Sequence, residues 1–272
     1  MRCPTTRYPL RKKRSSKPDS PPDVTSPLPG PWLVSFTVMA RFPFLRPHVT
    51  FIPMLYLFDI DGTLVDTGGA GLASLKEATI QVFGHEGPPL DLAGSTDLGI
   101  VANIHAHFEI EPTKERIDSY FRLYLERLDA NLATGGYPGK VFGGVPEMLA
   151  ALAVREGASI GLLTGNIAGG AASKMRHYKL DHHFPFGAYG CDHADRNRLG
   201  PIALERAAAH AGRSFTAGET WIIGDTPKDI ACAHAIGARC LAVATGRFTA
   251  EELERYGADK VVETLEDAAG LI

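Results

Sequence analysis

The sequence has few cysteines and no long hydrophobic segment. Its 272 residues contain only Cys3, Cys191, Cys232 and Cys240, with no Cys-x-x-Cys pair among them. This spacing does not indicate a disulfide framework, so we expect reduced thiols and a cytoplasmic protein. No run of about 18 uninterrupted apolar residues is present, and we therefore expect no membrane-spanning helix and no membrane partner.

Positive charge is scarce outside the N-terminal segment. The formal net charge is −3, yet residues 1–53 hold nine lysines and arginines against two aspartates, together with eleven of the 19 prolines. The rest of the chain is acidic, which argues against a nucleic-acid partner because broad binding needs cations facing the phosphates. We predict that residues 1–53 are a disordered Pro/Arg-rich extension, and we hypothesise that the native protein starts near Met54.

From Met54 onward the pattern is that of an α/β protein. Hydrophobic residues make up 44% and charged residues 22% of the chain, as in globular proteins. Short apolar runs alternate with amphipathic stretches, which predicts a doubly wound parallel sheet with crossover helices. The expected strands are 55–59, 159–164, 220–225, 239–244 and 260–263. The expected helices are 145–155, 168–179, 200–212, 227–236 and 249–256.

One segment breaks this alternation. Residues 68–143 show no strong strand but three apolar stripes with helical spacing, of which Ile117, Tyr120, Tyr124 and Leu128 form the clearest. We predict that 68–143 is a helical cap inserted into an α/β core. That core comprises 54–67 and 144–272, with the glycine pairs at 68–69, 135–136 and 143–144 as hinges.

Isolated polar residues follow three of the expected strands. Asp59 and Asp61 follow the first strand, Thr164 ends the second and Asp225 follows the third. Ligands of open parallel sheets bind beyond the carboxyl ends of the strands, so these side chains are expected at one edge. Clustered carboxylates repel one another, and a divalent cation removes that cost. Hard oxygen ligands of this kind favour Mg²⁺ shared with phosphate oxygens.

Two of these segments resemble motifs of the haloacid dehalogenase-like (HAD) hydrolase superfamily. Residues 58–66, Phe-Asp-Ile-Asp-Gly-Thr-Leu-Val-Asp, are similar to its first motif, and residues 223–229, Ile-Gly-Asp-Thr-Pro-Lys-Asp, to its fourth. Thr164 in Leu-Leu-Thr-Gly-Asn is similar to the second. The likeness covers 54–272, with the insertion where the phosphoglycolate-phosphatase-like branch carries its small helical cap.

The resemblance implies catalytic roles that suit the residue types. Asp59 is expected to be a nucleophile that forms an aspartyl-phosphate. Asp61 is expected to protonate the leaving alcohol and then deprotonate the attacking water. Thr164, assisted by Gly165 and Asn166, is expected to bind a phosphoryl oxygen.

The resemblance also implies a Mg²⁺ site. Asp225 is expected to bind the metal together with the Asp59 carboxylate and the Asp61 main-chain carbonyl. Asp229 lies one helical turn later, where it either orients this metal shell or is an exposed first-turn carboxylate that favours the helix dipole.

One motif departs from the family. Its third motif usually supplies a lysine, but residues 192–201 contain none, and Arg196 and Arg198 are the nearby cations. A guanidinium stays charged and can bridge carboxylate and phosphate, so an arginine can fill that role. We favour Arg196, because its distance to Pro201 resembles the spacing after the usual lysine. If neither arginine pairs with the carboxylate and the phosphoryl group, the site is expected to be impaired or to have lost catalysis. The expected substrate-binding residues are Gly62, Thr63, Gly165, Asn166 and Arg198.

Other signals are weaker. Ser95 and Thr96 read as N-caps of a cap helix, although in similar enzymes this loop faces the substrate, so Thr96 or Asp97 is a candidate for substrate selection. His177, His182, His183 and His193 match no common zinc pattern and are expected at the surface. Gly68–Gly71 lacks the Lys-Ser/Thr of a P-loop and is interpreted as a hinge.

The predicted function is that of a Mg²⁺-dependent phosphatase. Its substrate is expected to be a small phosphomonoester, a phosphoglycolate-like metabolite. One alternative is a phosphotransferase such as a sugar-phosphate mutase of the same superfamily. Another is a catalytically silent binding protein on the same scaffold, which the missing lysine favours. The sequence leaves the substrate and the oligomeric state open.

Overall fold

The computed structural model describes residues 52–268 and 270–271, which belong to one compact unit. Six parallel strands form its sheet, in the order β5-β4-β1-β6-β7-β8. Their bounds are β1 Met54–Phe58, β4 Ala158–Thr164, β5 Gly187–Tyr189, β6 Thr220–Gly224, β7 Arg239–Val243 and β8 Lys260–Val262. The strands predicted from the apolar runs are all present, while β5 was not predicted.

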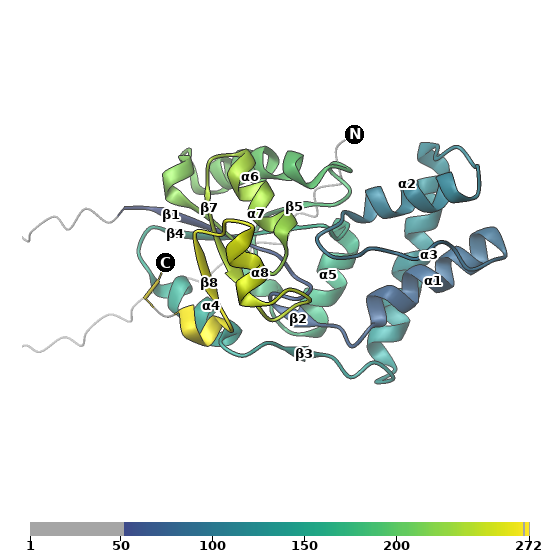
Figure 1. The fold of residues 1–272 in the computed structure, drawn as a ribbon, viewed down its shortest axis with the longest axis horizontal. Coiled ribbons are helices and arrows are strands. Elements are labelled where there is room, and N and C mark those ends of the chain that lie inside the picture. The colour runs from purple at the N-terminus through teal and green to yellow at the C-terminus, as the bar shows by residue number, and fades with distance from the viewer. Residues whose placement is uncertain (1–51, 269, 272) are drawn as a thin grey trace, which may run out of the picture. The chain divides into compact units, whose positions relative to one another are not determined.

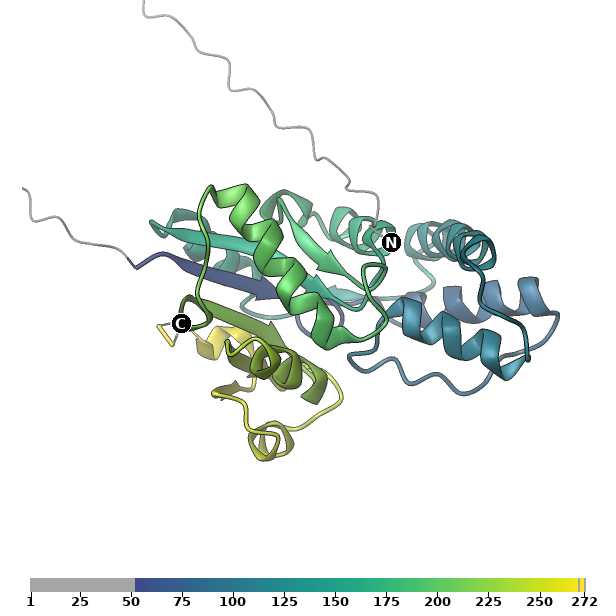
Figure 2. The same ribbon diagram turned by 90° about the horizontal axis from the view of Figure 1, so that it is seen from above.

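Helices cover both faces of this sheet (Figure 2). On β1, Tyr56 and Phe58 join the apolar cluster of one face, and Leu55 and Leu57 that of the other; all four are fully buried. The burial of each leucine or phenylalanine side chain contributes about 1.5–3 kcal/mol to stability. The first face carries α4 (Val145–Val154) and α5 (Ala168–His177), and the second carries α6 (Leu199–Ala211), α7 (Pro227–Ala235) and α8 (Ala250–Arg255). This arrangement confirms the predicted doubly wound α/β class.

Three further helices lie together beyond the carboxyl ends of the strands in both views (Figures 1 and 2). They are α1 (Ala70–Phe83), α2 (Asp97–His107) and α3 (Lys114–Ala133). They share an apolar cluster in which Tyr120 donates a hydrogen bond of 2.8 Å to the carbonyl of Leu75. On α1, Leu75 and Thr79 are buried, whereas Val82 is 45% exposed. The division into cap and core at residues 68 and 143 stays a prediction.

The chain enters and leaves these helices through a second, two-stranded sheet. In it β2 (Val65–Asp66) pairs antiparallel with β3 (Lys140–Val141). Gly139 lies so close to the carbonyl of Asp66 that any side chain there would overlap it. The two linkers are therefore packed side by side. The hinges at the flanking glycine pairs stay a prediction.

The remaining elements are short 3₁₀ turns: η1 Asp181–His183, η2 Arg196–Arg198, η3 Ala217–Glu219 and η4 Leu265–Ala268. None of the helices within the described ranges combines the length and hydropathy that a bilayer crossing requires. The predicted N-terminal extension lies outside the described residues except for its last two, Ile52 and Pro53.

Candidate active site

The turn after β1 places two carboxylates at the edge of the sheet. The N–H of Asp59 still donates to the carbonyl of Ile223 in β6, at 2.9 Å. The chain then turns back on itself, with the N–H groups of Leu64 and Val65 both donating to the carbonyl of Ile60. Gly62 adopts φ +84°, a backbone conformation that other residues rarely tolerate. Asp59 is left buried, while Asp61 opens toward solvent.

Asp225 follows β6 and lies against the same turn. Its Oδ1 accepts a hydrogen bond of 3.2 Å from the hydroxyl of Thr63. A β-carbon on either Gly62 or Gly246 would overlap its carboxylate, so two glycines make room for it. Burial raises the pKa of Asp225 well above its usual range, and the neighbouring Asp229 and Asp59 raise it further.

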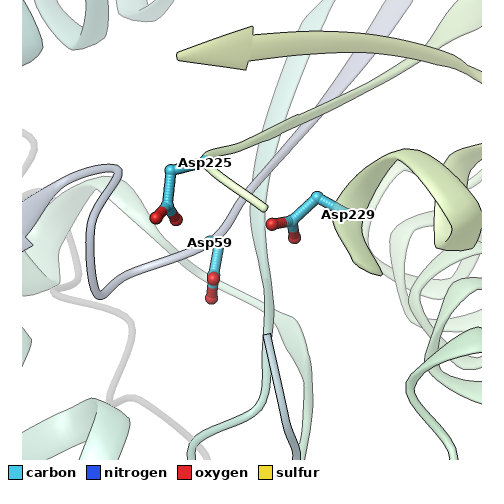
Figure 3. Close-up of side chains that lie close together, drawn as sticks. All are labelled: Asp59, Asp225 and Asp229. Carbon is cyan, nitrogen blue, oxygen red and sulfur yellow. The ribbon is translucent and has the colours of Figure 1, made fainter. Parts of the chain in front are cut away.

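Three carboxylates converge beyond the ends of β1 and β6. Oxygen atoms of Asp59, Asp225 and Asp229 lie within 4.8 Å of one another (Figure 3). Burial raises the pKa of Asp59 to about 6, with the Arg196 guanidinium opposing the shift. A group with this pKa is mostly ionised at neutral pH. The cluster therefore concentrates negative charge in a buried place.

Of the two candidate arginines, the structure brings Arg196 to the carboxylates. Its Nη2 lies 3.2 Å from Oδ2 of Asp59, and the same atom pairs with Oδ1 of Asp229. It also donates to the carbonyl of Leu163 at 3.3 Å. Arg196 is buried, whereas Arg198 is exposed and is not among the residues that line the cavity described below.

Asp229 is fully buried rather than exposed on the first turn of its helix. Its Oδ2 accepts hydrogen bonds from the N–H and the hydroxyl of Thr226, at 3.0 and 2.7 Å. This contact caps α7, and the other carboxylate oxygen faces Arg196. Asp229 thus links the start of α7 to the guanidinium.

The end of β4 supplies hydroxyl and amide groups. Thr164 is fully buried, and its Oγ1 accepts hydrogen bonds from the N–H and Nδ2 of Asn166, at 3.3 and 2.9 Å. Thr164 also hydrogen-bonds Asp59 and lowers the pKa of that carboxyl, against the larger effect of burial. Gly165 has no space for a β-carbon, because the carbonyl of Ser95 lies against it. The loop that precedes α2 therefore approaches the phosphate-binding candidates closely.

Lys174 is a residue of the site that the sequence pattern did not predict. This lysine lies in α5 and is 3% exposed, with Nζ at 2.8 and 2.6 Å from the two carboxylate oxygens of Asp61. A lysine within an amphipathic helical pattern normally indicates a solvated face. Nothing in the local pattern connects it to a residue 113 positions away.

A cavity of about 620 Å³ opens between the three helices and the sheet edge. Asp97 lines it from the N-terminus of α2, and its Oδ2 accepts the N–H of Ile167 at 2.8 Å. Burial raises the pKa of Asp97 to about 6, while Lys174 lowers it. Side chains that line the rest of the cavity include Asp59, Asp61, Leu72, Leu75, Leu90, Leu92, Tyr124, Lys140, Asn166, Lys174, Arg196, Asp225 and Arg247.

The doubly wound fold and its acidic strand ends define the class: an α/β protein whose cavity opens at the carboxyl edge of the sheet, where such folds bind their ligands. A model of the haloacid dehalogenase-like hydrolases matches residues 56–243. The chain therefore belongs to the haloacid dehalogenase-like hydrolase family, which confirms the resemblance seen in its motifs.

The chain is also similar to curated phosphatases over most of its length. The chain is 27% identical over 212 residues to N-acetylmuramic acid 6-phosphate phosphatase of Pseudomonas aeruginosa, covering 76% of this chain and 89% of that protein. It is 25% identical over 227 residues to phosphoglycolate phosphatase 1 of the same organism, covering 80% and 79%.

Solved structures share the fold. CbbY from Rhodobacter sphaeroides in complex with xylulose 1,5-bisphosphate aligns with a TM-score of 0.64 at 21% identity, covering 81% of this chain and 98% of that one. A phosphoglycolate phosphatase predicted in Haemophilus somnus aligns with a TM-score of 0.60 at 19% identity, covering 80% and 97%.

Proposed function

We propose that this protein is a Mg²⁺-dependent phosphatase that hydrolyses a small phosphomonoester through an aspartyl-phosphate. The observation that carries the proposal is the convergence of Asp59 and Asp225 beside the buried guanidinium of Arg196. The relatives named as phosphatases of N-acetylmuramic acid 6-phosphate and of phosphoglycolate support a small phosphorylated metabolite as the substrate.

The donor set fits a hard divalent cation. Carboxylate oxygens of Asp59 and Asp225 lie close together, and both groups have raised pKa values because burial disfavours their charged forms. Two glycines, Gly62 and Gly246, leave room for the carboxylate of Asp225. A bound Mg²⁺ would stabilise these ionised carboxylates and polarise a phosphoryl oxygen. Asp229 has its oxygens engaged by Thr226 and Arg196, so we assign it to orienting the arginine.

In the first step, a carboxylate oxygen of Asp59 attacks phosphorus. The new O–P bond forms as the bond between phosphorus and the leaving oxygen breaks, and the proton of Asp61 goes to that leaving oxygen. Such positioned proton transfer typically contributes about 10²–10⁴-fold in rate. The hydroxyl of Thr164 and the guanidinium of Arg196 lie beside Asp59, where they can stabilise charge on the transferred phosphoryl group.

In the second step, a water molecule attacks the phosphorus of the aspartyl-phosphate. Asp61, now a carboxylate, takes a proton from this water as the new O–P bond forms. The bond from phosphorus to Asp59 breaks, which releases phosphate and regenerates the carboxylate. The helical cover over the cavity limits access of other water during this sequence.

Turnover of p-nitrophenyl phosphate by the full chain tests the proposal. We expect phosphate release that depends on Mg²⁺ and that EDTA abolishes. The Asp59→Asn variant should show no turnover. The wild-type protein should carry an acid-stable phosphoryl group only transiently, because water hydrolyses the aspartyl-phosphate. A panel of phosphorylated metabolites then identifies the substrate. Formation of an isomeric phosphate without phosphate release would instead indicate a mutase. Absence of turnover under every condition would contradict the proposed activity and favour a binding protein.

A further inference from the structure

The site contains two buried cations, and each faces a different carboxylate. Arg196 lies against Asp59, with Nη2 3.2 Å from Oδ2. Lys174, from a different helix, lies against Asp61. The family motifs supply one cation to this site, which is Arg196 here, and they give Lys174 no role.

The hydrogen-bonding capacity of Lys174 is fully used by its neighbours. An ammonium group has three N–H donors and no acceptor. Its Nζ lies 2.8 and 2.6 Å from the two oxygens of Asp61 and 2.6 Å from Oδ1 of Asn166. These three acceptors match the three donors. Lys174 therefore has no donor left for a phosphoryl oxygen unless it releases Asp61 or Asn166.

Asn166 completes a clamp around the same carboxylate. Its Nδ2 donates to Oδ2 of Asp61 at 2.7 Å and to Oγ1 of Thr164 at 2.9 Å. The Asp61 carboxylate is thereby held at both oxygens by one ammonium and one amide. This clamp ties the orientation of Asp61 to the end of β4 and to the middle of α5.

Asp61 and Lys174 differ in solvent exposure. Both side chains line the cavity, but the Asp61 side chain is 44% exposed and the Lys174 side chain only 4%. A substrate therefore meets mainly the carboxylate, while the three donors of the ammonium stay engaged with Asp61 and Asn166. Holding a reactive group in one orientation is worth a large factor in rate, because a misplacement of about 1 Å can cost about 10²-fold.

We propose that Lys174 is a positioning residue: it holds the Asp61 carboxyl in the orientation in which, once protonated, this group gives its proton to the leaving oxygen. The inference rests on the proposed phosphatase function. The proposal predicts that replacing Lys174 lowers the rate most for substrates whose leaving oxygen must be protonated as it departs. A p-nitrophenolate leaves readily without a proton, whereas an alkoxide does not.

The test compares kcat/KM for p-nitrophenyl phosphate with kcat/KM for the best alkyl phosphate of the metabolite panel. Both values report only steps up to aspartyl-phosphate formation, so the later water attack does not enter. We expect Lys174→Met to lower the value for the alkyl phosphate by about 10²-fold and that for the aryl phosphate less than about fivefold. Lys174→Gln, which retains a donor, should recover part of the loss. Arg176→Met removes an exposed cation from the same helix and should change neither value.

A double-mutant cycle separates positioning from direct contact. In the Asp61→Asn background, Lys174→Met should cause no further loss, because the group that it positions is already inactive. Equal losses on both substrates, or losses that multiply in the double variant, would overturn the inference even if the wild type is an active phosphatase. A wild type without activity toward any phosphomonoester would contradict the proposed function itself. Thermal unfolding of each variant checks that the fold is retained.

Discussion

Arg196 contacts Asp59 and Asp229 with the same nitrogen atom, which lies 3.2 Å from Oδ2 of Asp59. One guanidinium thus joins the carboxylate at the end of β1 to the first turn of α7. Because α7 begins just after Asp225, the contact also fixes the spacing between the two strand ends that form the site.

Removing this cation should impair both activity and stability. We expect Arg196→Met to lower kcat/KM by at least about 10²-fold, since charge on the phosphoryl group loses its partner. The free energy of unfolding should fall by about 3–5 kcal/mol, because two buried carboxylates become unpaired. Chemical denaturation and steady-state kinetics measure the two effects. Arg198→Met removes an exposed arginine two residues away and should change stability by less than about 0.5 kcal/mol. Equal behaviour of the two variants would contradict the assignment.

The space around Asp225 should be sensitive to a single methyl group. In Gly246→Ala the added β-carbon overlaps the Asp225 carboxylate, which has to move. We expect about a 10²-fold loss of kcat/KM and a higher Mg²⁺ concentration for half-maximal activity. Gly218→Ala is the matched control, since a β-carbon there meets nothing within 4 Å. An unchanged Mg²⁺ titration in Gly246→Ala would argue against Asp225 as a metal ligand.

The N-cap of α2 also connects this helix to the loop that precedes η2. Thr96 accepts the N–H of Gly99 at 3.1 Å and donates to the carbonyl of Ala194 at 2.6 Å. Thr113 caps α3 in the same way, and within the described part of the chain its side chain makes no such bridge. Replacing either threonine by valine should cost about 1 kcal/mol in unfolding free energy. Only Thr96→Val should raise KM, and similar KM values in both variants would show that the bridge does not matter for binding.

Asp97 makes stability depend on pH. Burial raises its pKa from 3.8 to about 6, so the folded protein binds the proton more tightly than the unfolded chain. This contribution to stability is complete below about pH 4 and is lost as the pH rises through 6. The shift corresponds to about 3 kcal/mol. Asp97→Asn keeps an acceptor for Ile167 but does not titrate.

We therefore expect wild type to lose stability relative to Asp97→Asn between pH 4 and pH 7, as measured by denaturant unfolding at each pH. The comparison between the two proteins cancels titrations that they share. A difference that stays constant over this range would contradict the raised pKa of Asp97.

The sequence predicts the parts of this molecule that depend on local pattern. Buried parallel strands such as β1 and β6 are continuous apolar runs, and their polar residues fall at the strand ends. Strand β5 has only Gly187, Ala188 and Tyr189, too short a run to stand out from a loop. The two-residue strands β2 and β3 are defined by their mutual pairing, which no local pattern encodes.

The candidate site likewise contains residues that local sequence motifs indicate and residues that only tertiary packing brings to it. Asp59, Asp61 and Asp225 are marked by short motifs at strand ends, so sequence alone indicates them. Arg196 was favoured over Arg198 from spacing, and the structure places it beside Asp59. Lys174 acquires its position only when α5 packs on the sheet and brings it to Asp61, a contact between residues far apart in the chain.

The antiparallel pairing of Val65 with Val141 means that the chain departs from the sheet and returns to it at neighbouring points. A segment attached in this manner can change length or sequence without altering the course of the strands. The carboxylates at the sheet edge and the helices α1 to α3 that line the cavity are consequently free to diversify independently. One catalytic framework can therefore serve many different phosphate esters.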